Sequence, residues 1–338
     1  MYGKGTNKSV MEDVVTMYTL ANSFETYKYN SFPTEDSDIE TYYNEHQNDF
    51  DIVTYRSFMT QGTIEAAEGE TLTDEQNEEN KAQAKAAADT MLASITDEAS
   101  FNTAAQNAAP EEDKSDYDDP DQTLVTDATY ATTSSTSEDI ANWLFDSSRQ
   151  EGDTTSIEVG DNYYVLYFIS RGRNEYNTKN VRHILVRYDT TVDDSGNEIV
   201  TDEAKEEAMA TAEEIYDVWK SGDATEESFA ELANERSEDG AVGGLYENVY
   251  KGEMVASFEN WCYDESRQPG DTEIIESDYG CHIMYFIGDG EQYYKVQVAD
   301  AIKTNGYNDF LTEALELYPA EEMTANLKAT TYGGKKEA

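Results

Sequence analysis

An internal repeat constrains the fold of this chain more than any other feature of its sequence. Residues 140–169 (IANWLFDSSRQEGDTTSIEVGDNYYVLYFI) align without a gap with residues 258–287 (FENWCYDESRQPGDTEIIESDYGCHIMYFI) at an offset of 118, and 14 of the 30 aligned positions are identical. Upstream, residues 98–105 (EASFNTAA) match residues 226–233 (EESFAELA) at an offset of 128. Self-similarity of this extent indicates two copies of one structural unit.

The repeat divides the 338 residues into four segments. We expect the first copy over residues 49–173 and the second over residues 174–290. Residues 1–48 and 291–338 would form helical segments that flank the copies. A chain of this length has room for two or three domains of ordinary size, which agrees with this division.

Hydrophobic periodicity in the second copy predicts a strand, then helices, then further strands. Val181, His183 and Leu185 share one face of an alternating stretch over residues 181–186. The spacing of Ser228 and Glu231 is that of a capping box, which predicts a helix from residue 229. The expected helices cover residues 202–220, 229–236 and 254–264, and the later strands cover residues 271–276 and 281–287. Helices packed on a small antiparallel sheet give an α+β fold.

The flanking segments are expected to be helical over residues 10–29, 36–50 and 306–327. In the first of these, apolar residues recur at helical spacing, including Val14, Met17 and Leu20. A short amphipathic helix gains most of its stability from packing, so we expect the two flanks to bury their apolar stripes against each other. Frayed helical termini are the alternative.

The charge balance excludes several classes of partner. Lys and Arg number 23 and Asp and Glu number 72, so the net charge is −49. A protein with this charge is repelled by nucleic acid and by anionic lipid surfaces, so neither is expected as a partner. The longest strongly apolar run, residues 163–169, is much shorter than the roughly 20 residues that a spanning helix needs, so we expect no membrane insertion.

Cysteine content and the first residues bear on the compartment. Two cysteines exclude a disulfide scaffold and a four-cysteine zinc site, although a Cys262–Cys281 disulfide stays open at this stage. Residues 1–10 contain no apolar core of a signal peptide. The expectation is therefore either a cytosolic protein or a chain that begins after a removed export or anchor segment.

Four blocks of the second copy resemble the parvulin-type peptidyl-prolyl isomerases. They occur in the family's order, namely RHILV at 182–186, ESFAELANERSEDG at 227–240, GGLYENVYKGEM at 243–254 and YGCHIMYF at 279–286. The layout is similar to that of the extracytoplasmic foldases of Gram-positive bacteria, in which parvulin modules lie between helical chaperone segments. The resemblance implies a protein that is secreted or membrane-anchored and that acts on unfolded clients containing Xaa-Pro bonds.

The chemistry implied by the resemblance needs no metal, cofactor or nucleophile. Resonance sets a barrier of about 18–20 kcal/mol to rotation about the peptide bond, and an enzyme need only bind the twisted amide more tightly than the planar one. By family analogy, His183 and His282 lie on adjacent strands as a hydrogen-bonded pair, with Asp239 near the rotating amide. The expected proline pocket consists of Met254, Phe258, Val249 and Tyr246.

The first copy keeps the repeat motif but lacks the histidines. Residues 53–59 align with residues 181–187 at the offset of 128, which puts Tyr55 in the place of His183, and the offset of 118 puts Tyr164 in the place of His282. Ile140 replaces Phe258. We therefore expect a degenerate module without isomerase activity, which serves as a client-binding or spacer unit.

Two functions follow from these observations. The first is a peptidyl-prolyl isomerase and foldase for exported proteins. The second is a holdase chaperone or client-binding module with parvulin shape and negligible isomerase activity. The family usually carries an aromatic residue where Val249 stands and an acidic residue where Leu245 stands, so a shallower pocket and lower activity than in typical members are expected.

Overall fold

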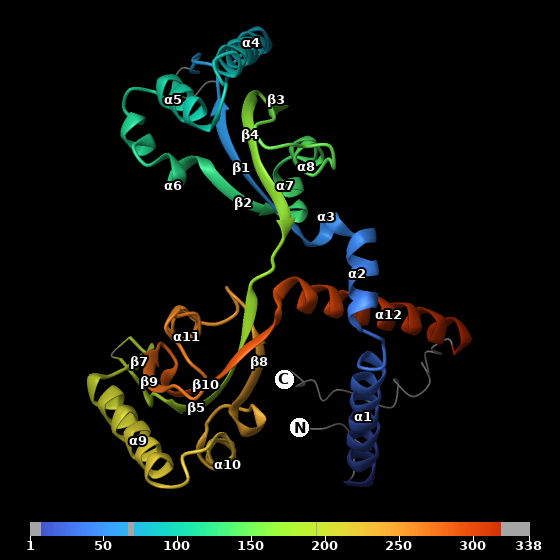
Figure 1. Ribbon diagram of the computed structural model, residues 1–338, viewed down its shortest axis with the longest axis vertical. Coiled ribbons are helices and arrows are strands. Elements are labelled where there is room, and N and C mark those ends of the chain that lie inside the picture. Colours follow the sequence, from blue (N-terminus) through green and yellow to red (C-terminus); the bar gives the residue numbers. More distant parts are fainter. Residues whose placement is uncertain (1–7, 67–70, 194, 319–338) are drawn as a thin grey trace, which may run out of the picture. The chain divides into compact units, whose positions relative to one another are not determined.

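The computed structural model describes residues 8–66, 71–193 and 195–318. The described residues divide into two compact units, one within residues 46–294 and a helical one that contains residues 8–45 and 295–318. The larger unit contains both copies of the repeat (Figure 1). Their sheets lie within residues 51–173 and 177–292, and the segment boundaries expected from the sequence remain a prediction.

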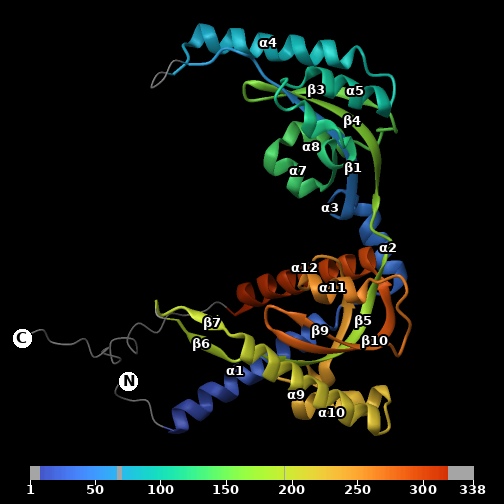
Figure 2. The ribbon, with the colours of Figure 1, turned by 90° about the vertical axis from the view of Figure 1, so that its left-hand side faces the viewer.

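The second module is a four-stranded antiparallel sheet with helices on both faces (Figure 2). The strand order is β8-β5-β10-β9. Its strands are β5 (Asn177–Arg187), β8 (Leu245–Val249), β9 (Thr272–Ser277) and β10 (Gly280–Gln292), and its helices are α9 (Asp202–Ser221), α10 (Glu226–Arg236) and α11 (Ala256–Cys262). A small hairpin, β6 (Thr190–Val192) and β7 (Glu198–Val200), occupies the polar loop after β5.

The first module repeats this architecture. Its sheet has the order β2-β1-β4-β3, which is the order of the second sheet with each strand replaced by its repeat equivalent. Its strands are β1 (Asp51–Thr60), β2 (Val125–Thr129), β3 (Thr154–Val159) and β4 (Asn162–Arg173), and its helices are α4 (Asp74–Leu92), α5 (Glu98–Ala108), α6 (Pro120–Leu124), α7 (Tyr130–Thr136) and α8 (Glu138–Leu144). The predicted α+β class with two tandem modules is confirmed.

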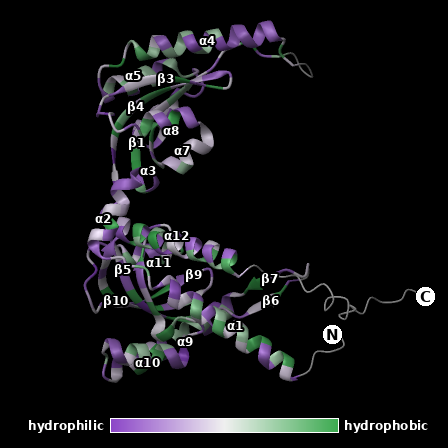
Figure 3. Ribbon diagram, turned by 90° about the vertical axis from the view of Figure 1, so that its right-hand side faces the viewer, coloured by the Kyte–Doolittle hydropathy of each residue, from purple (hydrophilic) through white to green (hydrophobic). Residues whose placement is uncertain are grey.

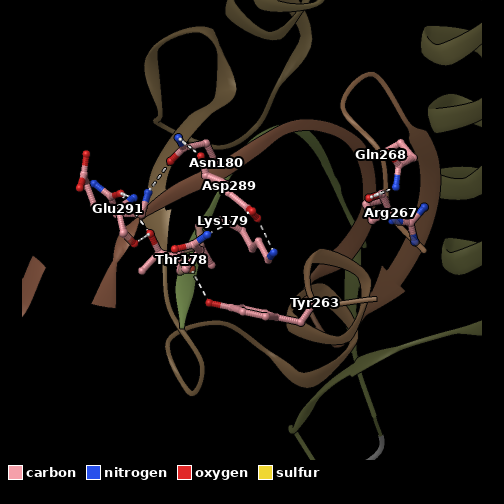
Figure 4. Close-up of polar contacts among 11 residues, drawn as sticks. Thr178, Lys179, Asn180, Tyr263, Arg267, Gln268, Asp289 and Glu291 are labelled. Atoms are coloured by element: carbon pink, nitrogen blue, oxygen red, sulfur yellow. Dashed lines mark hydrogen bonds and ion pairs between the residues drawn. The ribbon is translucent and has the colours of Figure 1, made fainter. Parts of the chain in front are cut away.

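A polar network stabilises the pairing of β5 with β10 beyond a bulge at Ile287 (Figure 4). Lys179 Nζ lies 2.6 Å from Asp289 Oδ1, and the Thr178 hydroxyl donates to the carbonyl oxygen of Glu291 at 2.7 Å. Because a slip of one residue would turn every side chain of a strand to the opposite face, these contacts help to fix which residues of β10 face the site.

The strand pairings correct the alignment of the two first strands. Tyr55 pairs with Phe168, whose repeat equivalent Phe286 pairs with Val181. Tyr55 therefore corresponds to Val181, at an offset of 126 instead of 128 (181 − 55 = 126). The prediction that Tyr55 replaces His183 is wrong.

Ser57 takes the place of His183. Ser57 pairs with Leu166, and His183 pairs with Met284, which is the repeat equivalent of Leu166. The bulge also falls at the same repeat position in both sheets, after Phe168 and after Phe286. Side chains alternate along a strand with a period of two, so a shift of two residues leaves the hydrophobic pattern unchanged, and the sequence pattern alone could not reveal it.

A partly buried ion pair occupies the same place in both modules and supports the offset of 126. Arg56 Nε donates to Glu98 Oε1 at 2.9 Å, and Arg182 Nε donates to Glu226 Oε1 at 3.0 Å. The two glutamates are the first residues of α5 and α10. In each module the pair joins the first strand to the helix that packs behind it.

Two helix starts differ from the predictions by three or more residues. Helix α10 begins at Glu226, because Thr225 is its N-cap and forms a capping box with Ser228, one turn before the predicted start. Helix α12 (Tyr293–Leu317) begins well before Gly306. Gly306 lies inside this helix because the ring of Phe32 packs against it, 2.6 Å from where a Cβ would be. Residues 319–327 of the predicted helix lie outside the described part of the chain.

In the helical unit, α1 (Lys8–Tyr29) and α2 (Asp36–Glu45) contact α12, whereas the short α3 (Gln47–Phe50) belongs to the larger unit. The rings of Phe24 and Phe310 lie 5.9 Å apart, and Lys295 Nζ lies 2.7 Å from Asp36 Oδ1. The expectation that α1 buries its apolar stripe is wrong. Met17 is 64% exposed and Leu20 is 69% exposed, since the contacts with α12 begin only near the end of α1.

Figure 3 displays apolar residues interspersed with polar ones along α1. Within the described residues, no helix combines the length and the hydropathy that crossing a bilayer requires.

A close backbone contact behind the site gives a prediction on stability. Gly244 has φ +62°, and a Cβ there would lie 2.1 Å from the carbonyl oxygen of His183. Gly252 has φ +87° with nothing within 4 Å of its Cβ position. Gly252→Ala should lower the free energy of unfolding of the second module by about 1 kcal/mol, the cost of the left-handed backbone, and Gly244→Ala by about 3 kcal/mol because a steric overlap is added.

Denaturant unfolding of the full chain, followed by tryptophan fluorescence, measures both variants. Equal losses would contradict the contact of Gly244 with the strand that carries His183.

Candidate active site

Five polar side chains form one hydrogen-bonded chain on a single face of the second sheet. Ser277 Oγ lies 2.7 Å from His282 Nε2, and His282 Nδ1 lies 3.2 Å from His183 Nδ1. His183 Nε2 lies 3.0 Å from Asp239 Oδ2, which also accepts the hydroxyl of Tyr246 at 2.8 Å. The structure thus brings together the three predicted residues His183, Asp239 and His282.

Strand register places the two imidazoles side by side. His183 pairs with Met284 and His282 pairs with Leu185, so the histidines are diagonal neighbours on β5 and β10. Residues at paired positions point to the same face of an antiparallel sheet, and diagonal neighbours on that face are within reach of ring side chains. The two rings are 4% and 5% exposed, respectively.

The loop after α10 carries Asp239 to the histidines by pairing with the backbone of β5. The hydroxyl oxygen of Ser237 accepts the backbone N–H of Leu185 at 3.1 Å and that of Asp239 at 3.2 Å. The backbone N–H of Glu238 donates to the carbonyl oxygen of Leu185 at 2.9 Å. The Ser-Glu-Asp sequence at residues 237–239 therefore positions a carboxylate next to His183.

The ends of the hydrogen-bonded chain determine both tautomers. A carboxylate only accepts, so His183 donates from Nε2 to Asp239, and in the neutral ring Nδ1 is then an acceptor. His282 then donates from Nδ1, and its Nε2 accepts from Ser277. The backbone N–H of Tyr279 already donates to Ser277 Oγ at 3.1 Å, which leaves the hydroxyl proton of Ser277 for His282. This assignment, made from the network, satisfies every ring nitrogen with both histidines neutral.

The pKa shifts give the same protonation states as the hydrogen-bond network. Burial lowers the pKa of His183 in spite of Asp239, and it lowers the pKa of His282 to about 4, with the neighbouring His183 adding to the effect. Partial burial alone would raise the pKa of Asp239, but the hydrogen bond from Tyr246 and the interaction with His183 lower it. Burial and the bond to Asp239 raise the pKa of Tyr246 to about 12. Near neutral pH the site holds two neutral imidazoles, one carboxylate and one phenol.

The predicted pocket residues take different positions. Phe258 from α11 lies edge-on to the rings of His183 and His282, with centroids 5.3 and 5.8 Å away. Met254 packs half-buried on the same apolar cluster. Val249 is 1% exposed, so it supports the site from within the core and does not line it, contrary to the prediction. Tyr246 has a polar role in addition to the predicted apolar one, because its hydroxyl donates a hydrogen bond to Asp239.

Sequence reasoning missed Ser277, the last residue of β9. Its repeat equivalent in the first module is Val159, at the offset of 118. Positions that differ between the copies are candidates for the site, so the alignment of the repeats held a signal for this residue.

Both cysteines lie in the described chain as free, buried thiols. Cys281 packs with the helices α9 and α10, whereas Cys262 packs with Met284 and Phe286 on the other face of the sheet. A Cys262–Cys281 disulfide is therefore excluded, and Cys281 points away from the site.

Comparison with known proteins defines the class. Residues 34–175 and residues 164–287 each match a family model described as a PPIC-type PPIase domain. The chain therefore belongs to the PPIC-type (parvulin-type) peptidyl-prolyl isomerase family and contains two such domains in tandem.

Among individual proteins, the chain is similar to foldase protein PrsA 1 of Listeria innocua serovar 6a. The two are 33% identical over 122 residues, which is 35% of this chain and 38% of that protein. The chain thus matches well under half the length of this curated relative.

Two solved structures are also similar to parts of the chain. PrsA from Bacillus subtilis is 20% identical over 46% of this chain and 55% of that one, with a TM-score of 0.29. PrsA from Bacillus cereus is 23% identical over 46% of this chain and 56% of that one, with a TM-score of 0.26.

The neutral histidine pair predicts a pH-dependent stability. The pKa of His282 is about 4 in the folded protein and about 6.5 in an unfolded chain. Between these values the unfolded state binds the proton and the folded state does not, so the stability that this group contributes is complete above about pH 6.5 and is lost as the pH falls towards 4.

The free energy of unfolding, measured with denaturant at about pH 7 and again at about pH 5, should therefore fall by about 2 kcal/mol more in the unmodified protein than in His282→Gln. The many surface carboxylates are common to both proteins, so their effect cancels in the comparison. An identical change in the two proteins would contradict the low pKa.

Proposed function

We propose that the second module is a peptidyl-prolyl cis-trans isomerase that acts on Xaa-Pro bonds by binding the twisted amide. The observation that carries the proposal is the pair of neutral imidazoles joined to the carboxylate of Asp239 beside the ring of Phe258. The match of residues 164–287 to the PPIC-type domain supports the same reaction.

The mechanism follows from what rotation does to an amide. In the planar state, resonance places partial negative charge on the carbonyl oxygen, and rotation removes that charge and returns a lone pair to the nitrogen. A fixed carboxylate next to the carbonyl, Asp239 in this module, disfavours the planar charge distribution more than the twisted one. The buried imidazoles hold that carboxylate ionised and oriented, so little reorganisation is needed during the reaction.

The apolar part of the site would hold the proline ring. Phe258 and the half-buried Met254 supply this surface next to the polar chain. No covalent step is required, because the catalytic effect consists of tighter binding of the transition state. A thousandfold acceleration corresponds to about 4 kcal/mol of such differential binding.

The clients and the compartment belong to the same proposal. Similarity to a foldase and the acidic, cysteine-poor composition support an extracytoplasmic protein that acts on unfolded or partly folded exported proteins. The first module would not catalyse isomerisation, since Ser57 and Tyr164 stand where the second module has His183 and His282.

Isomerisation of an Xaa-Pro peptide tests the proposal. The full chain should accelerate cis-trans exchange measured by NMR or by a protease-coupled assay. His183→Ala and Asp239→Ala should each lower kcat/KM by about 10- to 100-fold, the effect of losing one charge-assisted hydrogen bond in the site.

The first module supplies the matched control. Ser57→Ala, at the position that corresponds to His183, should leave the rate unchanged. The proposal fails if the full chain does not exceed the uncatalysed rate, or if the variants of the two modules lose activity equally.

A holdase function is the second candidate, and the exposed apolar residues of α1 favour it. Met17 and Leu20 are both more than half exposed. Unfolded proteins present apolar segments that such a surface can bind. This activity does not require the histidine pair and could exist with or without isomerisation.

Aggregation of a denatured client, followed by light scattering, separates the two functions. Met17→Ser with Leu20→Ser should weaken suppression of aggregation by at least about twofold, and His183→Ala should not change it. Loss of suppression in His183→Ala alone would tie holding of the client to the catalytic site instead.

A further inference from the structure

The first module contains a cavity at the place where the second has its catalytic residues. Its volume is about 280 Å³, and its walls include Ser57, Tyr164 and Ile140. By strand register and repeat offset these residues correspond to His183, His282 and Phe258.

Smaller side chains explain why the space is open. In the second module the rings of His183, Tyr246 and Phe258 contact one another, with centroid distances of 5.1 and 5.3 Å from the imidazole. The first module has Ser57 in place of His183, and Ile140 in place of Phe258. Thr126 replaces Tyr246, because Thr126 pairs with Tyr55 and Tyr246 pairs with Val181, which are equivalent positions of the two first strands. The strand order is the same and Tyr55 adds one ring in the place of Val181, so a net loss of two rings leaves space here.

The cavity offers hydrogen-bond donors on an apolar floor. Tyr55 and Tyr164 are half-buried, and neither phenolic oxygen has a hydrogen bond to another residue of the described chain. Ile140 and Leu166 are buried beneath them. A phenol donates readily to a carbonyl oxygen, so the arrangement suits a group that combines an apolar ring or side chain with a peptide carbonyl.

The charges around the cavity favour a neutral ligand. Among the described residues that line it, none is Lys, Arg or His. Asp127 is the one acidic residue there, and its Oδ1 already accepts the hydroxyl of Thr54 at 2.5 Å. An anionic group would gain no partner on entering a partly apolar space, and a cationic group would find only the exposed carboxylate of Asp127.

We propose that this cavity is a second peptide-binding site, which takes an uncharged, proline-containing segment and does not isomerise it. The ring of the proline packs on Ile140 and Leu166, and the preceding carbonyl accepts from Tyr55 or Tyr164. Without the carboxylate and imidazoles of the second module, the site binds planar and twisted amides alike, and such uniform binding gives no acceleration. This inference rests on the proposed function in one respect only, the choice of a proline-containing peptide as the ligand.

Backbone amide NMR of the full chain, titrated with acetyl-Ala-Ala-Pro-Phe-amide, tests the site. We expect shifts at residues 55–57, 126–128 and 164–166 in addition to those of the second module. The double variant Tyr55→Phe with Tyr164→Phe should bind at least about fivefold more weakly at these residues, the loss expected for one hydrogen bond. Tyr117→Phe, a tyrosine of the same module outside the cavity, should bind as the unmodified chain does.

Ile140→Trp, which fills the cavity, should abolish the shifts of the first module and leave the isomerisation rate of the second unchanged. Absence of shifts in the first module, or their persistence in both the double variant and a folded Ile140→Trp, would overturn the site. Should Ile140→Trp fail to fold, the double variant decides. Shifts in the first module without any acceleration of exchange would instead refute the isomerase function and leave this site standing.

Discussion

The hydrogen bond between Nδ1 of His183 and Nδ1 of His282 forms only when one ring donates and the other accepts, so the accepting ring is neutral and the two rings cannot both be charged. Burial keeps both rings neutral, and the two groups that flank the histidine pair, Asp239 and Ser277, decide which ring donates. A buried polar group without its partner costs about 1–3 kcal/mol. The loop after α10, the turn from β9 to β10 and the pairing of β5 with β10 therefore have to agree in position.

The same dependence explains how the two modules differ. Removing one member of a buried polar pair leaves the other unsatisfied, whereas replacing both members can be nearly neutral. In the first module both histidines are gone, and Val159 stands in the place of Ser277. Residues outside the site are kept, such as the Arg56–Glu98 pair and its counterpart Arg182–Glu226. The fold thus tolerates loss of the whole network better than loss of a part.

The sequence was sufficient for features with a strong local or repeated signal. The tandem fold followed from the internal repeat, and the meeting of His183, Asp239 and His282 followed from the resemblance of their motifs to the parvulin family. The match of Tyr55 to His183 failed because a shift of two residues preserves strand alternation. The exposure of Met17 and the burial of Val249 depend on which element packs over each residue, and a residue's own hydropathy does not contain that information. The polar role of Tyr246 likewise depends on where the loop carries Asp239.

The position of the site on one face of the sheet follows from the lengths of the covering helices. The 20-residue α9 and the 11-residue α10 cover one face of the second sheet, and the other face is covered by the 7-residue α11. The first module has a similar asymmetry, with α4 and α5 on one face and the 7-residue helices α7 and α8 on the other. A helix of two turns spans about 10 Å and cannot cover a four-stranded sheet. The histidines and the cavity of the first module both lie on the face that carries only short helices, so the two proposed sites occupy the same face of their sheets.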